Sequence, residues 1–159
     1  MLNEEPTFTS SVYYRDVKAA LEWLERAFGF ELTMAIEGPP DAPEMGHWEM
    51  SCAGEGRVMI GAEWESLVRS PAAIEGANTQ RVHVMLSGTA ADLDAHCDKA
   101  RANGATISME PADQFYGDRT YRALDPEGHS WTFSARVRDV SRAEAEQAIG
   151  QPIESTTWS

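Results

Sequence analysis

The stretch Arg26–Met34, RAFGFELTM, recurs 75 residues later as Arg101–Met109, RANGATISM. Arginine, alanine, glycine and methionine occupy the same places in both stretches. A second pair, Ala53–Ile60 (AGEGRVMI) and Asp125–Thr132 (DPEGHSWT), shares a Glu-Gly step at an offset of 72 residues. Repetition of this kind indicates that the chain consists of two related modules. We expect a linker between them at about residues 66–79.

Local patterns in the first half predict a strand, a helix and three more strands. From Thr7 to Tyr14 the polar and apolar residues alternate, as in a half-buried strand. Asp16 then suits the N-cap of a helix with its apolar residues on one face, and Gly29 suits the left-handed position that ends it. The three strands are expected at residues 30–36, 46–52 and 56–64.

The second half predicts the same order of elements. A strand at residues 81–87 precedes a helix that Thr89 caps and Gly104 ends. Three strands follow at residues 105–109, 119–124 and 129–135. A capping box formed by Ser141 and Glu144 predicts one more short helix near the C-terminus.

These elements predict an α+β fold in a single domain, residues 1–159. The domain contains two βαβββ modules, residues 7–65 and residues 80–138, related by a pseudo-twofold axis. A C-terminal helix and tail occupy residues 139–159.

The charge and composition of the chain limit its partners. The formal net charge is −13 at neutral pH. Nucleic acids and anionic membranes attract basic surfaces, so we expect neither as a partner, and a cationic ligand would be favoured at long range. The N-terminal stretch lacks the pattern of a signal peptide, and no apolar run is long enough to span a bilayer. Cys52 and Cys97 form no metal-binding or redox motif, which favours a cytoplasmic location.

Three stretches, taken in order, resemble the vicinal oxygen chelate superfamily of glyoxalases, bleomycin-resistance proteins and extradiol dioxygenases. They are YRDVKAALEWLERAFGFE, DLDAHCDKARANGA and FYGDRTYRALDPEGHSW. The resemblance covers about residues 7–138, and the trailing VRDVSRAEAEQAIG is similar to a glyoxalase-like subgroup whose members mostly lack assigned functions. It implies curled mixed sheets that form a cup, helices outside the cup, and a homodimer.

The resemblance also implies positions for a metal. Enzymes of the superfamily hold a divalent ion on the cup, with His, Glu or Gln ligands from the first and last strands of each module. The corresponding positions in this sequence are Thr9 or Ser11, Ile60 or Gly61, Arg81 or His83, and Thr132. His83 is the one metal-ligating residue among them, and Glu63 would join it only after a shift of register. We therefore expect no metal or other cofactor, with one divalent metal as the open alternative.

Strand alternation assigns residues to the cup or to the helices. Val82 and Val84 are expected under a helix, so Arg81 and His83 share the opposite face. The residues expected to bind a ligand are Thr9, Ser11, Trp48 or Glu49, Met59, Arg81, His83, Tyr116, Arg119 and Thr132. A mixed polar and soft apolar cup suits a small organic molecule. A packed core or a dimer seam is the alternative for this face.

The charged run from Phe115 to Trp131 lies at the last two strands of the second module. Asp125 and His129 flank a Pro-Glu-Gly turn that has a counterpart in the first module, so we expect them to be structural. Tyr116 lies in a loop at a strand end, where an aromatic ring can meet a ligand. For Arg119 we expect pairing with nearby groups, and contact with a ligand is the alternative.

Three functions remain open from the sequence. The first is a metal-independent, dimeric binding protein that sequesters a cationic or aromatic compound; the acidic charge and the five tryptophans favour it. The second is a glyoxalase-like lyase, isomerase or dioxygenase in which His83 serves as acid and base or as a metal ligand. The third is an interaction domain without a ligand. The residue pattern does not identify the compound.

Overall fold

The computed structural model describes residues 6–159 and contains two modules of the same build. The first consists of β1 (Ser10–Tyr14), α1 (Val17–Phe28), β2 (Phe30–Ile36), β3 (His47–Cys52) and β4 (Glu55–Ala62). The second consists of β5 (Val82–Leu86), α2 (Ala90–Ala102), β6 (Thr106–Asp113), β7 (Asp118–Leu124) and β8 (Ser130–Arg136). Two short 3-10 turns, Pro43–Met45 and Pro71–Ala73, and the helix α3 (Arg142–Ile149) complete the order of elements. The prediction of two βαβββ modules is confirmed.

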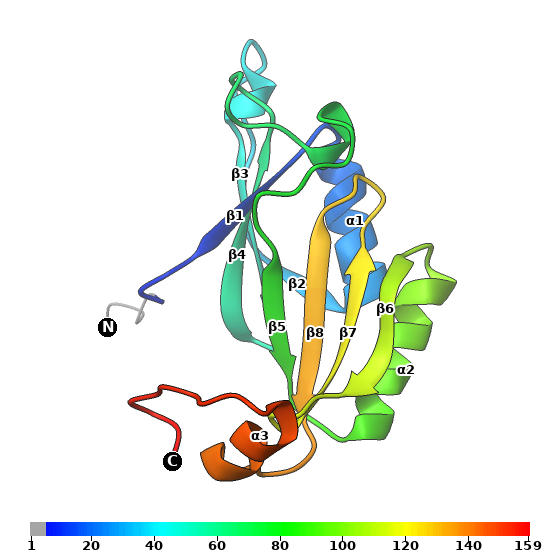
Figure 1. Ribbon diagram of the computed structural model, residues 1–159. Helices are drawn as coiled ribbons and strands as arrows, with labels where there is room; N and C mark the ends of the chain where they lie inside the picture. The colour runs from blue at the N-terminus through cyan, green and yellow to red at the C-terminus, as the bar shows by residue number, and fades with distance from the viewer. Residues whose placement is uncertain (1–5) are drawn as a thin grey trace, which may run out of the picture.

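Each module forms one four-stranded mixed sheet. The strand orders are β1-β4-β3-β2 and β5-β8-β7-β6. In both sheets the first strand of the module runs parallel to the last, and the other neighbours are antiparallel. Figure 1 shows the two sheets, with α2 beside the second sheet and α3 at one of its ends. None of the helices in residues 6–159 is long and apolar enough to cross a membrane.

The helices begin and end at the residues that the sequence indicated. The Asp16 side chain accepts a hydrogen bond from the backbone N–H of Ala19 at the start of α1, and Gly29 ends this helix with a φ of 71°. At the start of α2, Thr89 and Asp92 form a reciprocal capping box. The first and second predicted helices are therefore fixed by local chemistry at their ends.

The two modules share one hydrophobic core. Phe28, at the end of α1, packs against Phe133 of β8 with ring centroids 4.7 Å apart and against Trp131 at 5.7 Å. His96 of α2 lies among these rings; its Nε2 donates to the Phe28 carbonyl at 2.9 Å, and its Nδ1 lies 2.6 Å from the Tyr121 hydroxyl. Burial lowers the pKa of His96, so the neutral imidazole is the favoured form. The helix-facing sides of both sheets are thus committed to packing.

A buried carboxylate connects the modules at the turn between β7 and β8. Oδ2 of Asp125 accepts hydrogen bonds from the Tyr14 hydroxyl at 2.6 Å and from the Trp131 indole N–H at 3.0 Å. Nε2 of His129 donates to the backbone carbonyl of Tyr13 at 2.7 Å. Both Asp125 and His129 are more than nine-tenths buried. The structural role expected for these two residues is confirmed.

Candidate functional site

Each sheet has a second face that points away from the helices, and we call it the open face of that sheet. On the first sheet the strand register places Ser11 of β1 beside Met59 of β4 and Met59 beside Glu49 of β3. Directly paired residues project from the same side of a sheet. The Ser11 hydroxyl accordingly lies 3.6 Å from the Met59 sulfur. Three of the predicted ligand-binding residues therefore share one row of the first open face.

Glu49 is the charged centre of this row. Its carboxylate is buried, with Oε1 2.9 Å from Nε2 of His47 and Oε2 3.4 Å from Nη1 of Arg57. Arg57 also reaches the predicted residue Thr9, since its Nη2 lies 3.5 Å from the Thr9 hydroxyl. A buried carboxylate is costly unless it is paired, and these two partners supply that pairing. Thr9, Ser11, Glu49 and Met59 are thus brought together.

Trp48 does not belong to this face, which corrects its place among the candidate ligand residues. It pairs with Ile60 of β4, is 4 % exposed and packs in the hydrophobic core. Successive side chains of a strand point to opposite faces, so Glu49 can line the open face only if Trp48 faces the helices. Ile60 is buried for the same reason and is not a position from which a metal ligand could reach the cup.

A cavity of about 290 Å³ opens on the first open face. Its walls include the aromatic rings of Tyr13 and Trp64, the sulfur-bearing side chains of Met45 and Met59, and the carboxylate-bearing Glu44. No lysine or arginine occurs among the described residues that line it. Trp64 and Met45 are mainly exposed although both are large and apolar. Sequence reasoning missed both: Trp64 was expected at the end of a strand over residues 56–64, but β4 ends at Ala62, and Met45 lies in the 3-10 turn Pro43–Met45 outside any strand pattern.

The second open face collects another group of predicted residues. The register pairs His83 of β5 with Thr132 of β8, and Thr132 with Arg122 of β7. Nε2 of His83 lies 2.8 Å from the Ser134 hydroxyl. Arg81, just before β5, donates from Nε to the hydroxyl of Ser130 at 3.0 Å. Arg81, His83 and Thr132 therefore share the second open face, as strand alternation predicted.

Arg119 lies away from both open faces. Its Nε donates to Asp94 of α2 at 2.8 Å and its Nη1 donates to Asp113 of β6 at 2.9 Å. These hydrogen bonds raise the pKa of Arg119 above its ordinary value. Its neighbour Thr120 takes the open face, so Arg119 must point toward α2. Arg119 therefore pairs with nearby groups, as expected, and lies apart from the candidate ligand residues of the open faces.

Tyr116 lies in the turn between β6 and β7, at the end of the second sheet. Its ring packs edge-on against Phe115 with centroids 5.1 Å apart, and its carbonyl accepts a hydrogen bond from Nη1 of Arg136 at 3.1 Å. The structure therefore places Tyr116 at the rim of the second sheet rather than in the row of His83 and Thr132.

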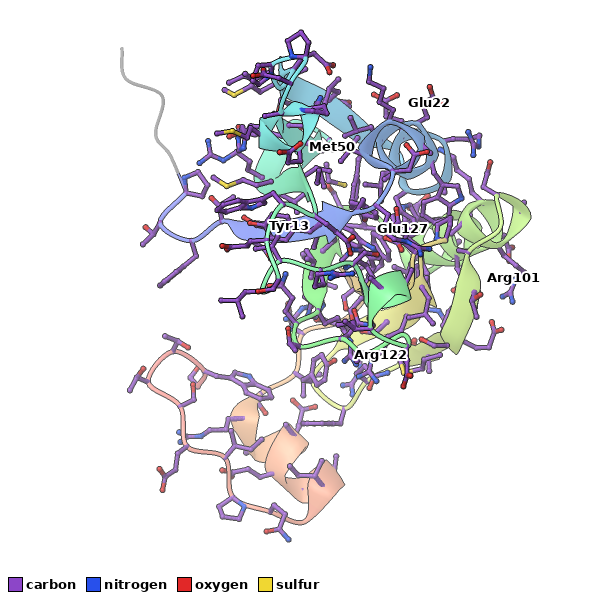
Figure 2. All side chains as sticks on the ribbon, turned by 90° about the horizontal axis from the view of Figure 1, so that it is seen from above. Tyr13, Glu22, Met50, Arg101, Arg122 and Glu127 are labelled. Carbon is purple, nitrogen blue, oxygen red and sulfur yellow. The ribbon has the colours of Figure 1, made fainter. Side chains whose placement is uncertain are left out.

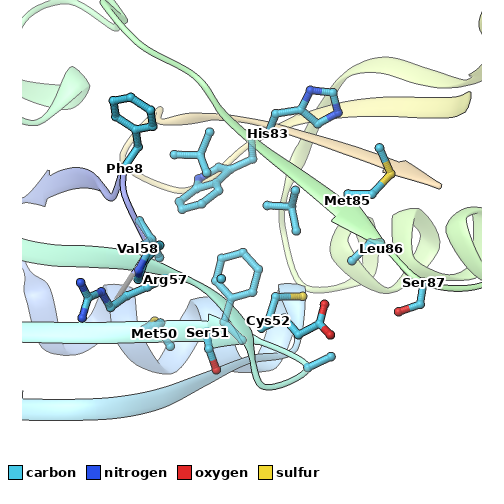
Figure 3. Close-up of a pocket in the computed structure, with 18 residues that line it drawn as sticks. Phe8, Met50, Ser51, Cys52, Arg57, Val58, His83, Met85, Leu86 and Ser87 are labelled. Carbon is cyan, nitrogen blue, oxygen red and sulfur yellow. The ribbon is translucent and has the colours of Figure 1, made fainter. Parts of the chain in front are cut away.

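A second cavity, of about 340 Å³, lies between the hairpin of β3 and β4 and the strand β5. Figure 3 shows this cavity, with Phe8 and Val58 on its walls. His83 also borders it, but in Figure 3 the ring of His83 points away from the strands of the first sheet. Arg81 and Thr132 are not among its lining residues. Arg81 and His83, both expected to bind a ligand, therefore do not line this cavity together.

A family model described as the Glyoxalase/Bleomycin resistance protein/Dioxygenase superfamily matches residues 8–133. The chain belongs to this superfamily. The match includes most of both modules, up to the middle of β8, and all ten candidate ligand residues. The resemblance inferred from sequence stretches is thus confirmed at the level of the superfamily.

Three solved structures share the fold of this chain. TioX from Micromonospora sp. ML1 is 29 % identical, with 86 % of this chain and 100 % of that chain covered and a TM-score of 0.60. TnmS3, an antibiotic binding protein from Streptomyces sp. CB03234, is 15 % identical, with 86 % and 99 % covered and a TM-score of 0.62. FosX, a fosfomycin resistance protein from Listeria monocytogenes complexed with Mn(II) and sulfate, is 12 % identical, with 84 % and 93 % covered and a TM-score of 0.57. Proteins that share this fold thus include an antibiotic binding protein and a protein complexed with Mn(II).

The side chains at the metal positions of the superfamily do not fit a divalent ion in this chain. Among the expected metal positions, those on the open faces include Ser11 and Gly61 in one module and Arg81, His83 and Thr132 in the other. They offer two hydroxyls, a guanidinium and a single imidazole, and Gly61 has no side chain, whereas divalent ions are held by three or more imidazole or carboxylate ligands. Residues 6–159 also contain no group of three or more His, Cys, Asp or Glu side chains placed to hold a metal.

Proposed function

We propose that this chain is a metal-independent binding protein that sequesters a small cationic, aromatic compound on its first open face. The observation that carries the proposal is the composition of the cavity at Tyr13 and Trp64. Two aromatic rings, two methionines, a glutamate and His47 line it, and no lysine or arginine occurs among its described walls. Aromatic faces attract cations, thioethers pack favourably against aromatic rings, and Glu44 adds an opposite charge.

The net charge of the whole protein also favours a cationic ligand. A net charge of −13 draws a cation toward the surface before any contact forms. The cavity volume of about 290 Å³ is at the small end of the usual range for ligand sites. TnmS3, which shares the fold, is an antibiotic binding protein, and this supports a binding role for the scaffold. The chemical class of the ligand rests on the cavity walls alone.

A second candidate function is catalytic, and it rests on His83. The imidazole is exposed on the second open face and is connected through Ser134 to Thr120, whose hydroxyls lie 2.7 Å apart. An accessible imidazole hydrogen-bonded to a hydroxyl has the chemistry of a general acid or base. Turnover of a compound that is lost in His83→Gln but retained in Trp64→Ala would favour this function over sequestration.

We also propose that the chain forms a homodimer. β1 and β5 each end a sheet, and no described strand pairs with their outer edges. The open faces carry exposed apolar side chains, Met34, Ile36 and Met85. Unpaired edges and apolar faces of this kind are commonly covered by a second chain. Sedimentation of a single species with the mass of one chain at micromolar concentration would contradict this.

The two free thiols, Cys52 and Cys97, suit the cytoplasmic location we propose.

Three matched probes test the binding proposal. The cation 9-aminoacridine, the neutral acridine and the anion 9-anthracenecarboxylate share a three-ring frame and differ in charge. We expect 9-aminoacridine to bind most tightly by isothermal titration and to raise the melting temperature of the protein. Trp64→Ala should weaken its binding about tenfold, because stacking and cation–π contacts are lost.

Leu67→Ala is the matched control, since Leu67 is also exposed but does not line the cavity. Its affinity should equal that of the unmodified protein. Equal binding of the cation and the anion, or equal affinities for Trp64→Ala and Leu67→Ala, would overturn the proposal. Metal independence is tested separately by elemental analysis of the purified protein: near-stoichiometric divalent metal that disappears in His83→Ala would contradict it.

A further inference from the structure

The open face of the second sheet is rich in arginine although the chain as a whole is acidic. Arg81 precedes β5, Arg122 lies on β7 and Arg136 ends β8. The register pairs Arg136 with Asp118, and these two form an ion pair with Nε 2.7 Å from Oδ1. On the same face of β7, Thr120 follows Asp118 and Arg122 follows Thr120. The positive charge of this face is therefore only partly neutralised by the chain itself.

Arg122 differs from the other arginines of the second sheet. Arg119 binds two aspartates and Arg136 pairs with one, whereas no hydrogen bond or ion pair within residues 6–159 reaches the guanidinium of Arg122. The side chain is partly buried, and its Nε is shielded from solvent. A guanidinium that loses water without gaining an acceptor is destabilising for the folded chain. Proteins often retain such a destabilising group where a bound ligand supplies the missing acceptor.

Thr132 provides a second, independent sign of a missing acceptor. It lies directly opposite Arg122 in the register, is 5 % exposed, and its hydroxyl has no hydrogen-bond partner in the described chain. Buried hydroxyls are usually paired. Two unpaired donors thus stand side by side on one face, in a row that His83 completes on the other side of Thr132.

The geometry leaves part of Arg122 open to a ligand. Its Nε is among the buried atoms without a partner, but its two terminal amino groups are not, so they reach the surface. Figure 2 shows Arg122 on the side of the second sheet that is turned away from α1, the helix that carries Glu22. A ligand approaching from the open side would meet the terminal amino groups first. A ligand can reach Nε and the Thr132 hydroxyl only if the Arg122 side chain moves, because both atoms are buried.

We propose that Arg122 and Thr132 form a binding site for an oxyanion, such as a carboxylate or a phosphoryl group carried by a small molecule. The planar fork of a guanidinium matches two oxygens of one anionic group, and the Thr132 hydroxyl supplies a further donor. The chain formed by His83, Ser134 and Thr120 lies in the neighbouring positions of the same face. The site is on a different sheet from the cavity at Tyr13 and Trp64, so it does not depend on the cation-binding proposal.

The test uses four probes with one ring and different head groups: benzoate, phenyl phosphate, benzenesulfonate and the neutral benzamide. Binding is followed by isothermal titration and by the NMR signal of the Arg122 Nε–H group, assigned with the Arg122→Gln variant. We expect at least one anion to shift this signal saturably, and benzamide to leave it unchanged. The anion that binds most tightly assigns the head group as carboxylate, phosphate or sulfonate.

Three variants separate this site from general electrostatic attraction. Arg122→Gln should weaken the preferred anion by about tenfold or more, and Thr132→Val should weaken it by a few fold. Arg142→Gln removes the same charge from α3, where Arg142 faces Glu146 across one helical turn, and should leave the affinity unchanged. Arg122→Gln and Thr132→Val should also melt at the same temperature as the unmodified protein or higher, because neither removes an internal bond.

Four outcomes would overturn the proposal. They are binding of benzamide as tight as that of the anions, an equal loss in Arg142→Gln, an Arg122 signal that no anion shifts at millimolar concentration, and a large fall in the melting temperature of Arg122→Gln. The last would mean that an internal partner already satisfies the guanidinium.

Discussion

The connection between the two modules can be tested through Asp125. This carboxylate is 4 % exposed and accepts four hydrogen bonds. Two come from the Tyr14 hydroxyl and the Trp131 indole, at 2.6 Å and 3.0 Å, and two from backbone N–H groups of its own turn. Asp125→Ala leaves the Tyr14 and Trp131 donors buried without an acceptor. Tyr14 is 111 residues away in sequence, so the loss falls directly on the contact between modules.

The magnitude follows from the number of donors left unpaired. Each buried donor without a partner costs about 1–3 kcal/mol, so Asp125→Ala should lower the free energy of unfolding by about 3–5 kcal/mol. Tyr14→Phe removes one donor and leaves Asp125 with three hydrogen bonds, which should cost about 1.5–3 kcal/mol. The double variant should lose less than the sum, because Asp125→Ala no longer leaves a Tyr14 hydroxyl unpaired.

Urea unfolding followed by tryptophan fluorescence and far-ultraviolet circular dichroism measures these values. Asp41→Ala is the control, since Asp41 is an exposed loop carboxylate, and its stability should change by less than about 0.5 kcal/mol. A loss in Asp125→Ala as small as that in Asp41→Ala would refute the reasoning. Strict additivity of the Asp125 and Tyr14 variants would show that their hydrogen bond does not couple the modules.

Two further predictions concern the core and the end of a helix. Burial holds the pKa of His96 below its ordinary value, so the unfolded chain takes up the proton first as the pH falls. The free energy of unfolding should therefore decrease as the pH drops below about 6.5. This group contributes at most about 1.4 kcal/mol per pH unit to the decrease. Urea midpoints between pH 7.5 and pH 5 should show a shallower slope in His96→Gln than in the unmodified protein, and equal slopes in the two proteins would contradict the assignment. Gly29→Ala should lower the free energy of unfolding by about 1 kcal/mol, because φ at this position is 71°, and Gly29→Asn should lower it by less. Equal stability of the two variants and the unmodified protein would show that the left-handed cap is not needed.

The order of elements could be predicted from the sequence because it depends on interactions over a few residues. Asp16 and Thr89 mark helix starts through bonds to backbone groups three residues away. Alternation over a few positions identified the strands, and the recurrence of Arg26–Met34 at Arg101–Met109 indicated the two modules before any contact was known. The same alternation placed Arg81 and His83 on one face.

The composition of the site could be predicted only in part, because each strand position leaves two faces to choose between. The register of β3 against β4 decided that Glu49, and not Trp48, lines the open face. Arg119 could not be assigned from its neighbours in sequence, since its partner Asp94 lies on a helix 25 residues earlier. Trp64 and Met45 lie in loops whose position over β1 and β4 no local pattern specifies.

The sequence by itself therefore determined the modules, the caps and the superfamily, all of which rest on short-range chemistry or on whole-chain similarity. Only the tertiary structure decided which side chains meet. It brought Asp125 to Tyr14, it surrounded Glu49 with His47 and Arg57, and it left Arg122 and Thr132 side by side without an acceptor. The physical reason is that register and packing between modules are set by contacts among residues far apart in the chain, which local backbone preferences do not specify.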